Sequence, residues 1–213
     1  MHSVVDVDIV ILNRNQGLLL ERAIRSGLAQ TFPGRFYEVL AVDAGSTDFS
    51  REVITSYGSR VRPVFLDPPA SLGQALCKGV RQASGRYVVL MRAQDFLSDY
   101  AILFQSVWLF QNPEYDGVSV DFCLVEPGTD SKVSRVSELG SANPFGTMFR
   151  KEVFMKEGLY EKEDARWEPE ALGIRLCEKY RIGHIPIPFY RYQQEASEKT
   201  NGAQIEPKGA SER

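Results

Sequence analysis

The chain has 213 residues, of which 43% are hydrophobic and 25% are charged, as expected of one globular domain with a sizeable core. Its formal net charge of −3 argues against a basic nucleic-acid-binding surface and against a polybasic patch for membrane lipids. No apolar stretch reaches the roughly 20 residues of a transmembrane helix, and the N-terminus lacks the pattern of a signal peptide. We therefore expect a cytoplasmic protein, with peripheral attachment to the inner face of a membrane left open.

The three cysteines, Cys77, Cys123 and Cys177, are far apart and odd in number. They form no Cys-x-x-Cys pair, and neither His2 nor His184 stands at a zinc-ligand spacing from them. We predict buried, reduced thiols and no zinc site.

The first half of the chain alternates strand and helix patterns. Apolar runs predict strands over 7–12, 37–42, 61–66 and 87–91, and helical spacing predicts helices over 17–29, 49–57 and 72–83. The strands show no polar alternation, which is typical of a parallel sheet covered by helices on both faces. Ligands of such sheets bind at the carboxyl ends of the strands, so the loops after Leu12, Val42 and Met91 are the first candidates for a site.

The second half is less regular. The patterns predict helices over 97–111, 150–156 and 170–179, a strand over 117–125, and a hairpin or mobile loop over 129–141. The stretch 182–192 contains Pro186 and Pro188, which favour an edge strand or a lone strand. Residues 196–213 are polar and small, so we predict a disordered tail after a single domain of residues 1–195.

The segment 43–48 directly follows the second predicted strand and reads Asp-Ala-Gly-Ser-Thr-Asp. Gly45 allows a sharp turn, and Ser46 and Thr47 can cap the helix predicted to start near Phe49. The first N–H groups of that helix then lie near the ligand crevice. The segment resembles the nucleotide-binding turn of the family-two glycosyltransferases, whose usual form is Asp-Asp-Gly-Ser-Thr-Asp.

Three further segments occur in the order and spacing of that family. Residues 30–33 are similar to Gln-Thr-Tyr-Pro, residues 73–87 to the block Gly-x-x-Ala-x-Asn-x-Gly and Ala-x-Gly-x-Tyr, and residues 149–160 to Phe-Arg-Arg-Glu-Val and Gly-Gly-Phe. The resemblance spans about Val7 to Tyr192. It implies an α/β fold of the GT-A type, in which a Rossmann-like, mostly parallel sheet is flanked by helices and joined by a smaller acceptor-side region.

The resemblance implies a transferase that moves a sugar from a nucleotide-diphosphate sugar to an acceptor hydroxyl, with inversion at the anomeric centre. The acceptor stays open between a glycan, a lipid-linked molecule and a protein, and so does a partner glycosyltransferase. The residues implied for the nucleotide sugar are Asn13, Asn15, Asp43, Ala44, Ser46, Gln74, Lys78, Arg92 and Gln94.

The chain departs from the family at the positions that carry the chemistry. The second Asp of the turn, which recognises the base, is Ala44, and the metal-binding Asp-Ala-Asp-Asp reads Arg-Ala-Gln-Asp over 92–95. Magnesium and manganese prefer carboxylate oxygens, so no metal ligand is predicted, although a divalent ion stays open as a cofactor. Because an arginine can bind a phosphate bidentately, Arg92 can replace the metal on the leaving diphosphate, with Asp95 orienting the donor. The alternative is that Arg92 is a solvated loop residue.

The family's general base lies in a Glu-Asp pair that corresponds to Glu168-Pro169. Proline cannot accept a proton, so Glu168 and Glu170 are the candidates for the base. Each is otherwise a surface carboxylate or a residue at the start of a helix. A general base contributes roughly 10²–10⁴-fold to a rate, so its loss would remove much of the activity.

Three functions therefore compete. The first is an active, metal-independent glycosyltransferase. The second is a catalytically inactive GT-A module that binds a nucleotide, a glycan or a partner protein, since fold alone does not carry function. The third, a nucleotidyltransferase, is disfavoured because the loop 13–17 holds one glycine and one arginine, whereas such enzymes usually carry a glycine-rich basic loop.

Overall fold

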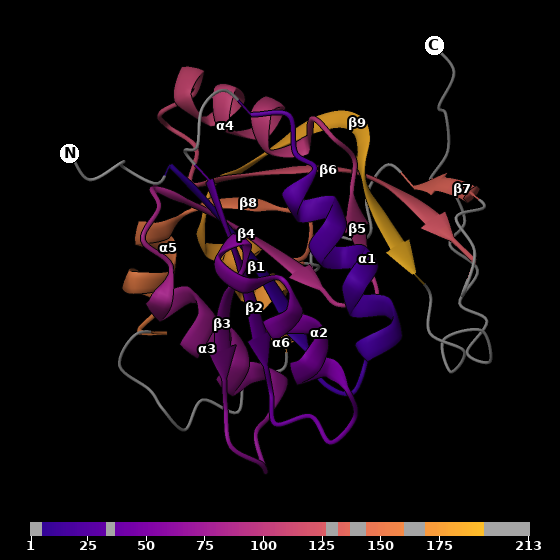
Figure 1. Cartoon of the computed structure of the whole chain (residues 1–213). Helices are drawn as coiled ribbons and strands as arrows, with labels where there is room; N and C mark the ends of the chain where they lie inside the picture. Colours follow the sequence, from indigo (N-terminus) through magenta and orange to yellow (C-terminus); the bar gives the residue numbers. More distant parts are fainter. Residues whose placement is uncertain (1–5, 33–36, 127–131, 137–143, 160–168, 194–213) are drawn as a thin grey trace.

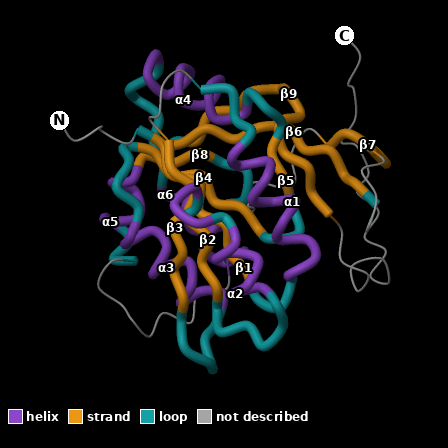
Figure 2. Tube along the Cα trace, in the orientation of Figure 1, coloured by secondary structure: helices purple, strands orange, loops and turns teal. Residues whose placement is uncertain are grey.

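The computed structural model describes residues 6–32, 37–126, 132–136, 144–159 and 169–193. The predicted tail 196–213 and most of the polar stretch 129–141 lie outside the described residues. Figure 1 shows one mixed sheet with helices packed against it, and Figure 2 shows the helices on both sides of the strands.

The N-terminal half forms the predicted parallel sheet. Its strands are β1 (Val7–Asn13), β2 (Tyr37–Asp43), β3 (Arg62–Phe65) and β4 (Tyr87–Arg92), in the spatial order β3-β2-β1-β4. All seven residues of β1 are buried, which explains the apolar run from Ile9 to Leu12. The register pairs Asn13 with Asp43, and Leu12 with Arg92, so the carboxyl ends of β1, β2 and β4 lie at one edge of the sheet.

Helices cover both faces of this sheet. They are α1 (Gly17–Leu28), α2 (Ser50–Ser56) and α3 (Leu72–Gln82), each within a few residues of its predicted bounds. A Cβ at Gly79 of α3 would lie 2.7 Å from the Val10 side chain, and one at Gly27 of α1 would lie 3.3 Å from Val39 and 3.8 Å from Ile9. Because neighbouring residues of a strand point to opposite faces, α3 and α1 cover opposite faces of β1.

The C-terminal half extends the sheet. Its strands are β5 (Phe96–Leu97), β6 (Gly117–Val125), β7 (Lys132–Val136), β8 (Met148–Arg150) and β9 (Ile182–Gln193). Strand β8 pairs antiparallel with both β4 and β6, and β9 pairs parallel with β6. Strands β1–β4, β6 and β9 therefore run in the same direction, which confirms a mostly parallel sheet.

Three helices accompany these strands: α4 (Ala101–Gln111), α5 (Lys151–Lys156) and α6 (Pro169–Lys179). The predicted helix 97–111 starts four residues late, because Phe96 and Leu97 pair as β5 with Arg191 and Tyr190. Helix α4 packs over β6 and β9, at the top of Figure 1. Of the helices that the structure describes, none combines the length and the apolar character needed to cross a lipid bilayer.

The prediction that 182–192 forms an edge strand holds for most of the stretch, because β9 pairs with β6 along its length while β5 pairs with it at Tyr190 and Arg191 alone. Strand β9 lies between β6 and β5 in the sheet. Its register with β6 shifts where Ile185 pairs with Val120 and the next pair is Pro188 with Asp121. Pro186 falls in this irregularity, where the regular pattern of strand-to-strand hydrogen bonds is interrupted, so its missing N–H group costs no such bond.

Asp8 places a carboxylate in the core at the start of β1. It is fully buried, and its Oδ2 accepts hydrogen bonds from the backbone N–H groups of Ser84, at 2.7 Å, and of Gly85. Its Oδ1 is buried without a hydrogen-bond partner among the described residues. Burial raises the pKa of Asp8 from 3.8 to about 6, although the two backbone hydrogen bonds oppose that rise.

Asp8 should make the fold more stable in weak acid than at neutral pH. Because the folded pKa lies above the unfolded one, the stabilisation is complete below about pH 4 and is lost as the pH rises through about 6. Asp8→Asn removes the titration, so between pH 4 and 7 the wild type should lose about 2–3 kcal/mol of unfolding free energy relative to this variant. Urea denaturation at both pH values measures the difference, and parallel pH profiles would refute the assignment.

Candidate functional site

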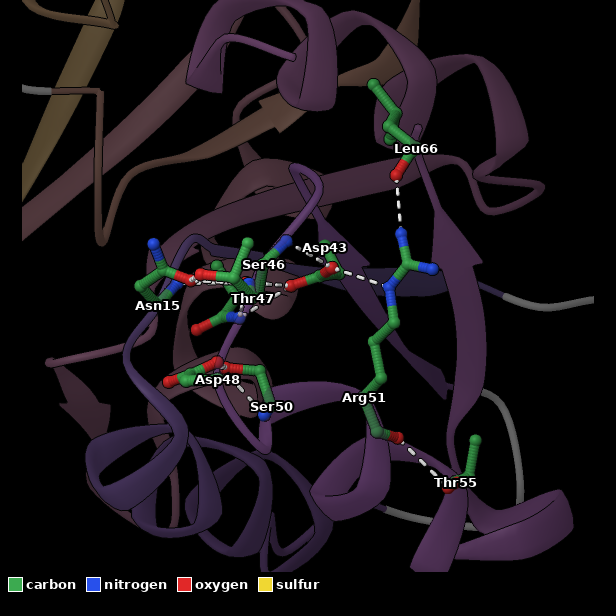
Figure 3. Close-up of polar contacts among 10 residues, drawn as sticks. Asn15, Asp43, Ser46, Thr47, Asp48, Ser50, Arg51, Thr55 and Leu66 are labelled. Carbon is green, nitrogen blue, oxygen red and sulfur yellow. Dashed lines mark hydrogen bonds and ion pairs between the residues drawn. The ribbon is translucent and has the colours of Figure 1, made fainter. Parts of the chain in front are cut away.

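Asp43, the last residue of β2, organises the turn that follows it (Figure 3). It is fully buried. Its Oδ1 accepts hydrogen bonds from Asn13 Nδ2, at 2.8 Å, and from Ser46 Oγ. Its Oδ2 accepts from the Ser46 backbone N–H, at 3.0 Å, and from Arg51 Nε, at 3.2 Å. Both oxygens are therefore committed to building the turn.

The loop after β1 is joined to the same turn. Ser46 Oγ accepts from Asn13 Nδ2 at 3.2 Å and from the Asn15 backbone N–H at 2.8 Å, while Asn15 Oδ1 accepts from the Thr47 backbone N–H at 2.8 Å. Asn15 has a φ of 53°, a left-handed conformation that asparagine tolerates better than most residues. Four of the residues predicted to bind the nucleotide sugar therefore lie together at the carboxyl ends of β1 and β2: Asn13, Asn15, Asp43 and Ser46.

Asp48, which the sequence did not single out, joins the starts of two helices beside this turn. Its Oδ2 accepts from the backbone N–H of Gly17 at 2.9 Å, and its Oδ1 accepts from the backbone N–H and the hydroxyl of Ser50 at 3.0 and 2.5 Å. It therefore caps both α1 and α2, so the prediction that Ser46 and Thr47 cap the helix is wrong. Burial favours a higher pKa for Asp48, but the hydrogen bonds from Ser50 and Gly17 outweigh it and lower the pKa.

The turn packs directly on the loop between β3 and α3. Gly45 has a φ of +74°, and a Cβ there would lie 2.9 Å from the Pro68 backbone nitrogen. Arg51 donates to the Leu66 carbonyl at 2.7 Å (Figure 3). Glycine is therefore required at position 45 both for its conformation and for the space that it leaves.

Gly45→Ala should destabilise the fold far more than Gly58→Ala. Gly58 has a φ of +55° but nothing within 4 Å of an added Cβ, so this variant should cost only the left-handed strain of about 1–2 kcal/mol. Gly45→Ala adds the clash with Pro68, for about 1–3 kcal/mol more. Urea denaturation of the two variants compares them, and equal losses would show that the turn does not depend on the contact with Pro68.

A cleft of about 320 Å³ opens beside this loop. Its lining residues come from the end of β3, the loop after it and α3: Phe65, Leu66, Asp67, Pro69, Ala70, Gln74, Cys77, Lys78 and Arg81. Gln74 and Lys78, also predicted to bind the nucleotide sugar, line this cleft and do not hydrogen-bond to Asp43. The Gln74 amide accepts from the Ser71 backbone N–H at 2.8 Å in a capping box, so part of its role is to start α3. Lys78 is exposed.

Arg92, at the end of β4, is held by Asp95. Arg92 Nε donates to Asp95 Oδ2 at 2.7 Å, and the Arg92 NH2 group donates to Asp95 Oδ1 at 3.1 Å and to the Gln193 carbonyl at 3.2 Å. The guanidinium also lies 4.1 Å from the centroid of the Tyr192 ring. Burial disfavours its charged form, but Asp95 outweighs burial and raises the Arg92 pKa further. With its side chain 12% exposed, Arg92 is not a solvated loop residue.

Asp95 is fully buried and serves several donors from β9. Besides Arg92, it accepts from the Tyr190 hydroxyl at 2.7 Å and from the Gln193 backbone N–H at 2.9 Å. Burial and the Asp95 charge raise the Tyr190 pKa well above its ordinary value, so this hydroxyl stays protonated as a donor. The carboxylate thus fastens the loop after β4 to the end of β9.

The segment 92–95 does not fit a divalent metal ion. Both Asp95 oxygens already accept hydrogen bonds, and the Arg92 cation lies against them. The Gln94 backbone carbonyl accepts from Arg22 at 2.8 Å. No group of three or more His, Cys, Asp or Glu side chains within the described ranges is arranged to hold a metal ion.

The remaining predicted site residues are placed as follows. Ala44 is 1% exposed and belongs to the hydrophobic core. Pro169 is the first residue of α6, a position where its missing N–H costs nothing. Glu168 lies outside the described residues, and Glu170 is in the first turn of α6, with its side chain outside the description. The Cys77 and Cys123 thiols are buried and free, as predicted.

Known proteins share this sequence pattern and architecture. The chain is 33% identical over 140 residues to an uncharacterized glycosyltransferase of Nostoc sp., which covers 63% of this chain and 41% of that protein. It is 28% identical over 106 residues to the glycosyltransferase GlyG of Streptococcus pneumoniae, covering 47% of this chain and 35% of that protein. The chain thus spans about two fifths of the length of these curated relatives.

Two solved structures show the same fold. TarS of S. aureus, in complex with UDP-GlcNAc, has a TM-score of 0.71 at 16% identity over 94% of this chain and 62% of that one. The mannosyltransferase PcManGT of Pyrobaculum calidifontis, in complex with GDP-Man and Mn²⁺, has a TM-score of 0.65 at 16% identity over 87% and 56%. The family model described as Glycosyl transferase family 2 matches residues 8–168. The chain therefore belongs to glycosyl transferase family 2 and has the GT-A fold expected from its sequence.

Proposed function

We propose that this domain binds a nucleotide-diphosphate sugar and transfers its sugar to an acceptor hydroxyl with inversion at the anomeric carbon. The observation that carries the proposal is the cluster of Asn13, Asp43 and Ser46 at the carboxyl ends of β1 and β2, beside an open cleft. This edge is where sheets of this kind bind ligands. The titles of the TarS and PcManGT structures name UDP-GlcNAc and GDP-Man as bound molecules, which supports a ligand of the same class here.

In this proposal the cluster acts as a rigid frame. Both Asp43 oxygens already accept hydrogen bonds within the turn. Asp43 therefore positions the loops and does not itself bind the nucleotide sugar. Arg14 lies between Asn13 and Asn15, is exposed, and makes no hydrogen bond or ion pair with another described residue. We assign the diphosphate to Arg14, since a guanidinium can bind two phosphate oxygens.

We place the diphosphate on Arg14 and not on Arg92, the sequence-based candidate. The charge of the Arg92 guanidinium is already balanced by the buried Asp95 carboxylate, and the group packs on an aromatic ring, whereas Arg14 is exposed and has no such counter-charge among the described residues. Because the segment 92–95 does not suit a metal ion, no step of the proposed transfer is routed through one.

Inversion by a single displacement needs a base for the acceptor hydroxyl. Pro169 cannot serve, so Glu168 and Glu170 stay the proposed candidates. A base worth roughly 10²–10⁴-fold makes the paired test direct: the glutamate that acts as base should lose that factor as glutamine, while the other should lose little. The acceptor itself, whether a glycan, a lipid-linked molecule or a protein, is left to the experiment.

A second candidate function is a non-catalytic module that binds a nucleotide sugar or a partner. It is motivated by the buried methyl group at Ala44, the closed Arg92–Asp95 pair and the proline at position 169. This candidate predicts nucleotide binding without turnover.

Release of nucleoside diphosphate from UDP- and GDP-sugars, across a panel of acceptors, separates the two. The transferase predicts release that persists in a chelator and falls at least about tenfold in Arg14→Ala. A strict need for manganese would overturn the metal-independent step. Nucleotide binding with no release from any donor would favour the non-catalytic module.

A further inference from the structure

We propose that Asp67 recognises the base of the donor nucleotide, in place of the carboxylate that the family carries at the position of Ala44. The carboxylate selects a base with a ring N–H group beside a carbonyl, which means uracil or guanine. The inference rests on the proposed function and names the substrate class of that site.

The turn after β2 has no carboxylate oxygen to offer a base. Ala44 presents only a methyl group, which is buried in the core, and its backbone N–H donates to the Asn13 carbonyl at 2.9 Å. Asp43 already accepts from Asn13, Ser46 and Arg51. An acceptor for the base must therefore come from an element beside the turn.

Asp67 is held beside the turn by both of its neighbours in sequence. The Leu66 backbone N–H donates to the Asp43 carbonyl at 2.9 Å, and the Leu66 carbonyl accepts from Arg51 at 2.7 Å. On the other side, the Pro68 nitrogen lies 2.9 Å from where a Cβ at Gly45 would be. The β3–α3 loop therefore keeps a fixed position against the turn, with Asp67 at the contact.

Asp67 and Lys78 line the same cleft and are both exposed. Neither makes a hydrogen bond or an ion pair with any residue in the described part of the chain. One is an acceptor and the other a donor, so the cleft offers both to a ligand that carries an N–H group and a carbonyl oxygen.

The chemistry of the bases decides which nucleotides fit. An ionised carboxylate only accepts hydrogen bonds. It can therefore accept the ring N–H of uracil or guanine, while the Lys78 ammonium donates to the adjacent carbonyl. Adenine and cytosine have a ring nitrogen with a lone pair at the corresponding position, and that lone pair repels the carboxylate. A charge-assisted hydrogen bond is strong enough to set a preference of roughly 10- to 100-fold.

Calorimetric titration of GDP, UDP, ADP and CDP into the full chain tests the inference. The wild type should bind GDP or UDP at least about tenfold more tightly than ADP and CDP. Comparison of the GDP and UDP titrations then identifies which base is preferred. Asp67→Asn should weaken the preferred nucleotide by roughly 10- to 100-fold and change ADP and CDP by less than about threefold. Glu52→Gln removes an equal charge from an exposed position on α2 and should change none of the four.

The outcomes separate the inference from the proposed function. If the preferred nucleotide binds Asp67→Asn within about threefold of the wild type, or if ADP and CDP bind as tightly as GDP and UDP, base recognition by Asp67 is wrong while nucleotide binding stands. Wild-type protein that binds none of the four overturns both. Because Asp67 is exposed, Asp67→Asn should keep the wild-type melting temperature. Lys78→Met, as a second variant, should weaken the same nucleotide.

Discussion

Asp95→Asn should destabilise the fold by about 3–5 kcal/mol, the usual cost of removing one partner of a buried ion pair. The variant leaves the Arg92 guanidinium, 12% exposed, without its counter-charge. It also turns the carboxylate that receives the Tyr190 hydroxyl and the Gln193 N–H into an amide with fewer acceptor sites. Urea denaturation at pH 7 measures the loss, which for a chain of this size corresponds to roughly 6–20 °C in melting temperature.

Two variants sharpen this test. Asp99→Asn removes an exposed carboxylate near Asp95 in sequence and should change stability by less than about 0.5 kcal/mol. The double variant Arg92→Met with Asp95→Asn removes both charges and keeps an amide oxygen that can still accept a hydrogen bond, so it should recover part of the loss. A loss below about 1 kcal/mol in Asp95→Asn would show that the pair does not fasten β4 to β9.

Asp43→Ala should cost about 3 kcal/mol or more and abolish nucleotide binding. It strips the acceptor from Asn13 Nδ2, from the Ser46 backbone N–H and hydroxyl, and from Arg51 Nε. Each buried donor left without a partner costs about 1–3 kcal/mol. Without Asp43, Asn13 and Ser46, which join the β1–α1 loop to the turn, lose their shared hydrogen-bond acceptor. Urea denaturation and nucleotide titration, each on the same preparation, measure the two effects.

Arg51→Met is the matched control for this variant. Arg51 is one of the Asp43 donors and is 38% exposed, so its loss should cost less than about 1.5 kcal/mol and should leave nucleotide binding measurable. If Asp43→Ala were as stable as Arg51→Met, the idea of Asp43 as the organiser of the turn would be wrong.

The sequence predicted the N-terminal half well for a physical reason. Strands β1, β2 and β4 are buried along most of their length, so each contains a run of apolar residues that ends at a polar one, at Asn13, Asp43 and Arg92. Parallel strands in register bring their carboxyl ends together. The contact of Asn13 with Asp43 and Ser46 could therefore be predicted from where the strands end in the sequence.

What the sequence did not reveal depends on contacts between distant segments. Asp95 and Arg92 are neighbours in sequence, but the Tyr190 and Gln193 groups that complete their site come from β9, almost 100 residues later. Strand β8 has three residues, too few for a periodic pattern to show. The role of Asp48 as a cap of α1 joins two segments 31 positions apart, and no local pattern predicts such a contact.

The most direct test of the central claim is calorimetric titration of GDP and UDP into the wild-type chain in the presence of a chelator, repeated with Arg14→Ala. Saturable binding of at least one nucleotide, weakened about tenfold or more in the variant, is the predicted result. The claim that the carboxyl ends of β1 and β2 form a metal-independent nucleotide site would be contradicted by no binding of either nucleotide, or by binding that appears only when manganese is added.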